Sequence, residues 1–149
     1  MSTNTLNTLA VEFNNYVREK GFWNEYDKAL KMCDEHDYSR IMAIRNAFLC
    51  QKLMLTVTEL SEAVEALRHQ KRCSMNPDEM KTMLESGQTE KFISEFSSKI
   101  KDTFEDELAD SLIRILDLSA ELEIDMDFHV KAKMMYNLTR DEMHGRKKF

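Results

Sequence analysis

Residues 48–67 read FLCQKLMLTVTELSEAVEAL, and this stretch decides the fold. Placed on a helix at about 100° per residue, its aliphatic side chains form one continuous stripe, and its polar side chains lie mainly on another face. Such a stripe predicts a buried core face on a long helix that runs from about residue 39 to 70, with a break possible near 43–46. The stripe consists of Leu49, Leu53, Val57, Leu60, Val64 and Leu67.

Two carboxylates in this stretch lie on neither the aliphatic nor the polar face. Glu59 and Glu62 share a third face with Phe48, Leu55 and Ala66, which reads as a second buried surface. A buried carboxylate without a partner is costly. The position of these two acids therefore predicts a compensating cation.

A second helix, expected over residues 103–123, shows a matching pattern. Apolar side chains cover more than half of its circumference, and one narrow stripe stays polar: Glu107, Asp110, Arg114, Asp117 and Glu121. Glu107 and Asp110 are three residues apart, so they lie on the same side of the helix. If the two helices pack antiparallel, four acids converge on one point.

Four carboxylates without a histidine favour Mg²⁺ or Mn²⁺, because these hard cations prefer oxygen ligands. A di-iron centre would need Glu-x-x-His on two helices, and the positions three after Glu59 and Glu107 hold Glu62 and Asp110 instead. The alternative is that the acids form an ordinary solvated face, with Asp110 and Arg114 as a surface ion pair at i, i+4.

The last helix, expected over residues 126–143, carries the opposite charge. Lys133, Asn137 and Arg140 recur on one face at i, i+4 and i+7. Arginine grips phosphate oxygens with two N–H groups, lysine acts as a point charge, and asparagine can donate a hydrogen bond. This face predicts a polyphosphate site, and solvated surface charges are the alternative.

Composition sets the fold class. The chain has 149 residues with three glycines and one proline, which indicates an all-α protein, and its length suits one domain over 1–149.

Gly21 ends a first helix, Asn76-Pro77 starts a short one that Gly87 stops, and Thr103-Phe-Glu-Asp106 resembles a capping box. The remaining predicted helices span residues 3–19, 77–86 and 90–101, whereas 24–38 is polar and weakly helical, and 144–149 is a basic flexible tail.

Charge and cysteine content exclude several classes of protein. A net charge of −6 argues against a nucleic-acid polymer as partner. No stretch reaches the roughly 20 apolar residues of a membrane span, and the N-terminus does not resemble a signal peptide. Three cysteines without metal-type spacing suit reduced thiols, so a cytoplasmic location is expected.

The two acidic motifs, Glu59-Leu-Ser-Glu62 and Glu107-Leu-Ala-Asp110, resemble the ExxE…ExxD signature of the MazG-like all-α nucleoside triphosphate pyrophosphohydrolases. The phage and bacterial members are similar over further segments, which are Lys20–Trp23, Leu53–Leu67, Asp106–Leu118, Lys133–Arg140 and a His144-Gly tail. The gap between the motifs is longer than is usual in the family, so residues 71–102 are expected to be an inserted helical segment.

The resemblance implies a four-helix bundle core that assembles as a homodimer or homotetramer. It also implies Mg²⁺-dependent hydrolysis of nucleoside triphosphates, deoxynucleoside triphosphates foremost, to the monophosphate and pyrophosphate in nucleotide-pool housekeeping. Glu59, Glu62, Glu107 and Asp110 would bind the metal, and Glu59 or Glu62 would orient or deprotonate the water. The substrate would be bound by Lys133, Asn137 and Arg140, with Trp23 as a base-stacking candidate.

Two other functions stay open on the sequence. A catalytically silent protein of the same fold would bind a nucleotide without turning it over. A plain helical interaction protein would carry the acids as solvated surface charges. Trp23 likewise has a second interpretation, because an aromatic pair after a helix end is often part of a core.

Overall fold

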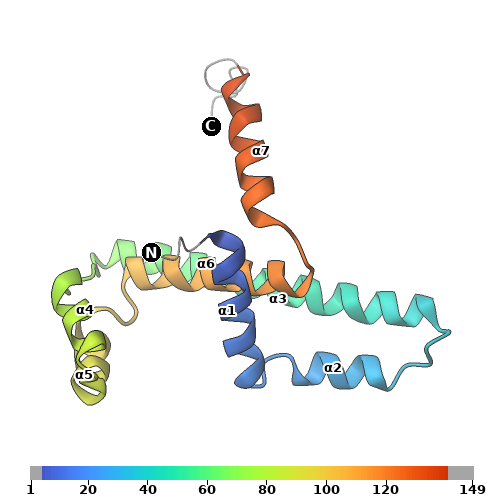
Figure 1. The fold of residues 1–149 in the computed structure, drawn as a ribbon, viewed down its shortest axis with the longest axis horizontal. Coiled ribbons are helices and arrows are strands. Elements are labelled where there is room, and N and C mark those ends of the chain that lie inside the picture. The colour runs from blue at the N-terminus through green and yellow to red at the C-terminus, as the bar shows by residue number, and fades with distance from the viewer. Residues whose placement is uncertain (1–4, 141–149) are drawn as a thin grey trace. The chain divides into compact units, whose positions relative to one another are not determined.

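The computed structural model describes residues 5–140, and within them the protein is all-α, with seven helices and no strand (Figure 1). The helices are α1 (Leu6–Glu19), α2 (Asn24–Lys31), α3 (Tyr38–Arg68), α4 (Pro77–Glu85), α5 (Thr89–Lys99), α6 (Phe104–Glu121) and α7 (Met126–Leu138). The prediction of an all-α protein is confirmed.

The described chain forms two compact units. The first consists of residues 5–24 and 116–140, and the second of residues 25–115. The chain passes from the second unit back to the first within α6, so that helix contributes its first two-thirds to one unit and its last turns to the other.

In the first unit, α1 and α7 cap each other's N-termini. The Asp127 carboxylate accepts hydrogen bonds from the backbone N–H groups of Leu6 (3.0 Å) and Asn7 (3.2 Å). In return, Asn7 Oδ1 accepts from the backbone N–H of Met126 at 2.8 Å. Each helix start thus has its unpaired N–H groups satisfied by the other helix.

The core of the first unit is built around Trp23 and Leu116, which are 1 % and 0 % exposed. The Trp23 indole donates from Nε1 to Asp117 Oδ1 at 3.0 Å, and Asn14 Nδ2 donates to the same oxygen at 2.9 Å. Asp117 is itself buried, and these bonds satisfy its carboxylate. This member of the polar stripe predicted on α6 therefore has a structural role.

In the second unit, α3 and the first part of α6 run antiparallel (Figure 1). Their directions follow from two cross-helix contacts. The backbone N–H of Phe104 donates to the carbonyl of Lys71 at 3.1 Å, and the Arg114 guanidinium donates to Glu59. The acidic helices therefore pack antiparallel, which is the condition under which their acids can converge.

Residues 71–102 form the helical segment that the sequence predicts between the two motifs. Its helices α4 and α5 pack against each other. The two ends of the segment lie side by side and are joined by a hydrogen bond from the Ser74 N–H to the Lys99 carbonyl, at 3.1 Å. A second bond, from the Cys73 N–H to the Glu105 carboxylate at 2.9 Å, joins the start of the segment to α6. The Asn76 cap and the Pro77 start of α4 are confirmed.

Several helix boundaries differ from the prediction. Helix α3 is unbroken through 43–46, and the polar segment 24–38 contains α2. Helix α7 ends at Leu138 instead of continuing to about 143, because its turn closes at Thr139, whose N–H donates to the Tyr136 carbonyl. The tail 144–149 lies outside the described residues.

The predicted capping box at Thr103 is only half formed. Thr103 Oγ1 accepts from the backbone N–H of Asp106 at 3.4 Å. The Asp106 carboxylate accepts from the backbone N–H of Asp102, at 2.9 Å, and not from that of Thr103. The second bond of the box is therefore shifted one residue toward the chain's N-terminus.

The largest correction concerns the aliphatic stripe of α3, which was expected to be buried. Its side chains are about half exposed, whereas Ala63 and Ala66 are buried. The reason is that α6 packs on the side of α3 that carries Glu59 and the alanines. The exposed fractions are Leu53 53 %, Val57 48 %, Leu60 46 %, Val64 51 % and Leu67 50 %.

None of the helices within residues 5–140 combines the length and the apolar character that a membrane crossing requires.

Helix α3 ends in a Schellman motif that also positions the next residues. The N–H of Lys71 donates to the Ala66 carbonyl at 2.9 Å, and that of Gln70 to the Leu67 carbonyl at 3.1 Å. Gln70 has φ +56°, in the left-handed region that favours glycine. The connection from α3 is thus held by backbone hydrogen bonds at the cost of one strained residue.

Replacing Gln70 with glycine should stabilise the protein, because glycine adopts this backbone without strain. We expect a gain of about 0.5–1 kcal/mol in the free energy of unfolding, measured by urea denaturation followed by circular dichroism. Arg68→Gly, two residues earlier within the helix, should instead cost about 1 kcal/mol. A loss of similar size in both variants would contradict the left-handed assignment of Gln70.

Candidate metal centre

Three of the four predicted carboxylates come together between α3 and α6. One carboxylate oxygen from each of Glu59, Glu62 and Glu107 lies within 4.8 Å of the other two. Glu59 and Glu62 are one turn apart on α3, and Glu107 is in the first turn of α6, so the antiparallel packing brings the ends of both motifs to one point.

Two of the three carboxylates are withdrawn from solvent. Glu59 and Glu107 are 7 % and 6 % exposed, and Glu62 is exposed. Burial, followed by the negative charges of Glu62 and Glu59, raises the pKa of Glu107 from an ordinary 4.5 to about 7. The ionised form of Glu107 is therefore disfavoured in the absence of a compensating cation.

Arg114 compensates part of this charge. Its Nε donates to Glu59 Oε1 at 2.5 Å, and its Nη2 contacts the same oxygen. The sequence suggested that Arg114 pairs with Asp110 along one helix, whereas the structure shows a cross-helix bond to Glu59. This bond occupies one oxygen of Glu59 and leaves Oε2 outside the ion pair.

Asp110, the fourth predicted ligand, is exposed and lies outside the group of three. Burial of the carboxyl itself and the charge of Asp106 contribute most to raising its pKa, and Glu59 and Glu62 contribute as well. Asp110 is thus close enough to interact electrostatically with the cluster. Its role as a ligand stays a prediction.

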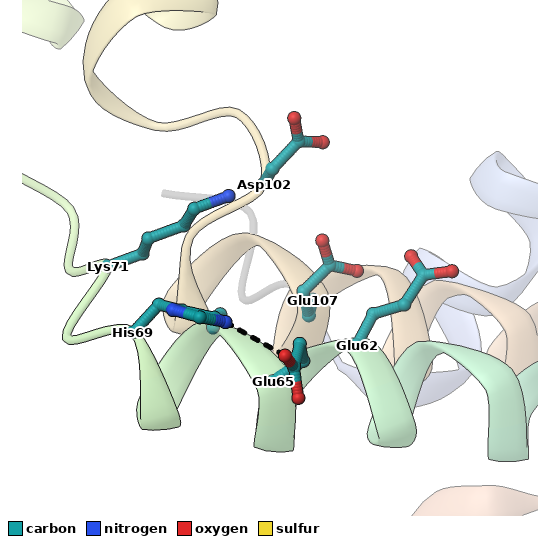
Figure 2. Close-up of a pocket in the computed structure, with 7 residues that line it drawn as sticks. Glu62, Glu65, His69, Lys71, Asp102 and Glu107 are labelled. Carbon is teal, nitrogen blue, oxygen red and sulfur yellow. Dashed lines mark hydrogen bonds and ion pairs between the residues drawn. The ribbon is translucent and has the colours of Figure 1, made fainter.

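A pocket of about 190 Å³ lies beside the cluster (Figure 2). Glu62 and Glu107 line one end of the pocket. The other end is lined by residues of the connection that follows α3 and of the connection that precedes α6. Figure 2 shows the carboxylates of Glu62 and Glu107 on the same side of the pocket, and His69 bonded to Glu65 at 2.8 Å. The lining residues are Glu62, Glu65, Ala66, His69, Lys71, Asp102 and Glu107.

The predicted phosphate-binding face lies on α7, in the first unit. Lys133 and Arg140 are exposed, and their charges lie 5.3 and 5.9 Å from the centre of the Tyr136 ring. Asn137 Oδ1 is buried without a hydrogen-bond partner among residues 5–140. The acids belong to the second unit, so a common site of the two groups stays a prediction.

Trp23 occupies the core of the first unit, as described above, and its ring is almost fully covered. This position favours the core interpretation over base stacking. Phe22, its neighbour, is 67 % exposed.

Sequence reasoning missed four side chains at this site, which are His69, Lys71, Asp102 and Arg114. Arg114 was recognised as part of a polar stripe and as an alternative ion-pair partner of Asp110, and not as the partner of Glu59. The other three lie in connections after α3 and before α6, where helical periodicity carries no signal. The positive φ values of Gln70 and Asp102, +56° and +60°, show that both connections turn sharply at the pocket.

The donor set suits a hard divalent cation. It consists of oxygen atoms only, and two of the three carboxylates are buried with insufficient positive charge. Ser111, one turn after Glu107, adds a buried Oγ without a hydrogen-bond partner among the described residues. Glu59, Glu62 and Glu107 are therefore able to hold a metal ion.

No family model, no curated protein and no solved structure matches this chain.

Neutralising Glu107 should stabilise the protein in the absence of metal, and only at high pH. Because folding raises its pKa, the stability associated with protonated Glu107 is complete below about pH 4.5 and is lost as the pH rises through about 7. With EDTA present, we expect Glu107→Gln to raise the Tm by about 5 °C at pH 8 and to leave it unchanged at pH 4.

Glu105→Gln, two residues earlier on α6, is the matched control. Its carboxylate accepts from the Cys73 N–H and from Arg72, and these bonds lower its pKa. The ionised form therefore stabilises the folded state at neutral pH, and the variant should lower the Tm there. Equal effects of the two substitutions at pH 8 would contradict the charge assignment of the cluster.

Proposed function

We propose that this protein is a Mg²⁺-dependent nucleoside triphosphate pyrophosphohydrolase of MazG-like type, with deoxynucleoside triphosphates as the foremost substrates. The observation that supports it best is the convergence of Glu59, Glu62 and Glu107 within 4.8 Å. The motifs that predict this function from sequence are the motifs whose acids meet in the fold. Mn²⁺ is expected to substitute for Mg²⁺, because both accept an all-oxygen site.

The reaction adds water across one phosphoanhydride bond. The water oxygen bonds to the α-phosphorus, the bond to the bridging oxygen breaks, and pyrophosphate leaves with that electron pair while one proton is released. Glu59, Glu62 and Glu107, with Asp110 as the proposed fourth ligand, would hold the cation. When bound, the metal would neutralise charge on the phosphates and increase the acidity of water at the site.

Glu62 is the stronger candidate for orienting or deprotonating the water. It is exposed toward the pocket and has no ion pair within residues 5–140. Oε1 of Glu59 accepts from Arg114, so this carboxylate is held in place and has only Oε2 left outside the ion pair. Lys133, Asn137 and Arg140 would bind the substrate from α7.

The alternative is a catalytically silent protein of the same fold. The bond between Arg114 and Glu59 favours it, because an internal cation already compensates one of the buried acids. Such a protein would bind a nucleotide without turnover. A plain interaction protein would bind neither metal nor nucleotide.

The hydrolase is tested by incubating the protein with each NTP and dNTP and Mg²⁺, and measuring pyrophosphate release. We expect turnover that EDTA abolishes, and a loss of at least about 100-fold in kcat/KM for Glu62→Gln, because one cluster carboxylate is removed. Asp110→Asn tests the fourth ligand in the same assay.

Glu85→Gln on α4 is the control, because it makes the same charge change at an exposed side chain outside the cluster. It should leave turnover unchanged. A rise in Tm with nucleotide but no pyrophosphate would establish the silent binding protein. If neither metal nor nucleotide raises the Tm and no pyrophosphate is released, the protein is a plain helical interaction protein.

We further propose that the chain assembles as a homodimer or homotetramer through the exposed stripe of α3. The side of α3 that faces α6 carries Glu59 and the small residues Ala63 and Ala66, while larger aliphatic side chains of both helices are about half exposed. On α6, Leu108, Leu112 and Ile115 are 42 %, 47 % and 40 % exposed. So much apolar surface on one helical pair is typical of an interface. Two such pairs would bury it in a four-helix bundle.

Leu60→Lys should disrupt this assembly, because it places a charge in the middle of the stripe. We expect wild type to sediment as a dimer or larger species and Leu60→Lys to shift toward the monomer in analytical ultracentrifugation. Ser61→Lys, the adjacent exposed residue, should retain the wild-type assembly. A monomeric wild type would refute the proposed interface.

A further inference from the structure

The pocket beside the carboxylates is small. Its volume of about 190 Å³ is below the roughly 300 Å³ at which pockets begin to enclose a whole drug-sized ligand. A nucleoside does not fit inside it together with phosphates. What fits is a short anionic group held next to the cation site.

Lys71 is fixed at the rim of this pocket by its backbone. Its N–H closes the Schellman motif at Ala66, and its carbonyl accepts from the N–H of Phe104, where α6 begins. Lys71 therefore ties together the ends of the two helices that carry the carboxylates. Figure 2 shows its side chain extending toward Asp102 and the Glu107 side of the pocket.

The Lys71 ammonium also differs from its neighbours in having no ion pair within residues 5–140. The other basic side chains around the site are each bonded to a carboxylate. The pairs are Arg114 with Glu59, His69 with Glu65, Arg72 with Glu105, and Lys101 with Asp102. Lys71 is the cation left to bind an anion from solution.

We propose that Lys71 binds the β- and γ-phosphates of the substrate, the part that leaves as pyrophosphate. This inference rests on the proposed function and specifies which end of the substrate enters the pocket. The cavity accepts a diphosphate and excludes the nucleoside, which stays outside. The Lys71 side chain donates hydrogen bonds to non-bridging oxygens, so it stabilises the charge that builds up on the leaving group.

The electrostatics of the pocket make this binding conditional on the metal. Glu62, Glu65, Asp102 and Glu107 would repel a free phosphate, and one lysine does not offset four acids. A divalent cation on the cluster reverses the local charge and lets a diphosphate bridge the cation site and Lys71. Pyrophosphate should therefore bind with Mg²⁺ and not with EDTA.

The test measures binding of inorganic pyrophosphate to the full chain by calorimetry in Mg²⁺. We expect Lys71→Met to weaken this binding about tenfold or more, because a charge-assisted hydrogen bond is lost. Product inhibition of the two proteins should differ for one product only. Lys71→Met should have a higher Ki for pyrophosphate than wild type and an unchanged Ki for the nucleoside monophosphate. Mn²⁺ binding without nucleotide should stay at the wild-type value, because Lys71 is not a ligand.

Lys71→Arg keeps the charge and should retain most of the pyrophosphate affinity. Lys81→Met removes an exposed lysine on α4 and should change nothing. Wild-type pyrophosphate affinity in Lys71→Met, or no pyrophosphate binding to the wild-type protein in Mg²⁺, would overturn the inference. Absence of turnover and of Mn²⁺ binding would refute the hydrolase, whereas Lys71-dependent pyrophosphate binding without turnover would refute only the catalysis.

Discussion

The meeting of buried carboxylates at the contact between α3 and α6 is the constraint on which the second unit depends. Helix pairs usually bury aliphatic side chains at their contact and expose polar ones. This pair departs from that pattern, since Glu59 and Glu107 lie inside together with small alanines, and the leucines and valines of the α3 stripe are about half exposed. Such an arrangement is stable only if charge is compensated inside and apolar surface is covered outside. Arg114 compensates part of the charge of the buried carboxylates, and a divalent cation would compensate the rest.

Compensation of the buried charge and coverage of the apolar surface link the proposed chemistry to the proposed assembly. A cation would offset the burial and the neighbouring negative charges that raise the pKa of Glu107, and a second copy of the chain would cover the stripe on α3. Both additions act on one helical pair, from opposite faces. Metal binding and association are therefore expected to stabilise each other, because each favours the same packing of α3 against α6.

The segment 71–102 between the two acidic motifs does more than separate them. Its first and last residues, Lys71 and Asp102, line the pocket beside the carboxylates. Hydrogen bonds from Cys73 and Arg72 to Glu105 join its base to the first turn of α6. The segment that separates the two acidic motifs thus forms one end of the proposed site. This is a physical reason for the pocket to select a compact anion.

The sequence alone determined the all-α class and most helix boundaries, because helical periodicity and capping residues are local properties. It also identified Glu59, Glu62 and Glu107, since carboxylates on apolar-flanked faces stand out against that periodicity. Only the tertiary structure decided that Arg114 bonds to Glu59, that Trp23 lies in the core and that the α3 stripe is exposed. It also decided the place of Lys71, because backbone hydrogen bonds in a connection fix it and no repeating pattern marks such a residue.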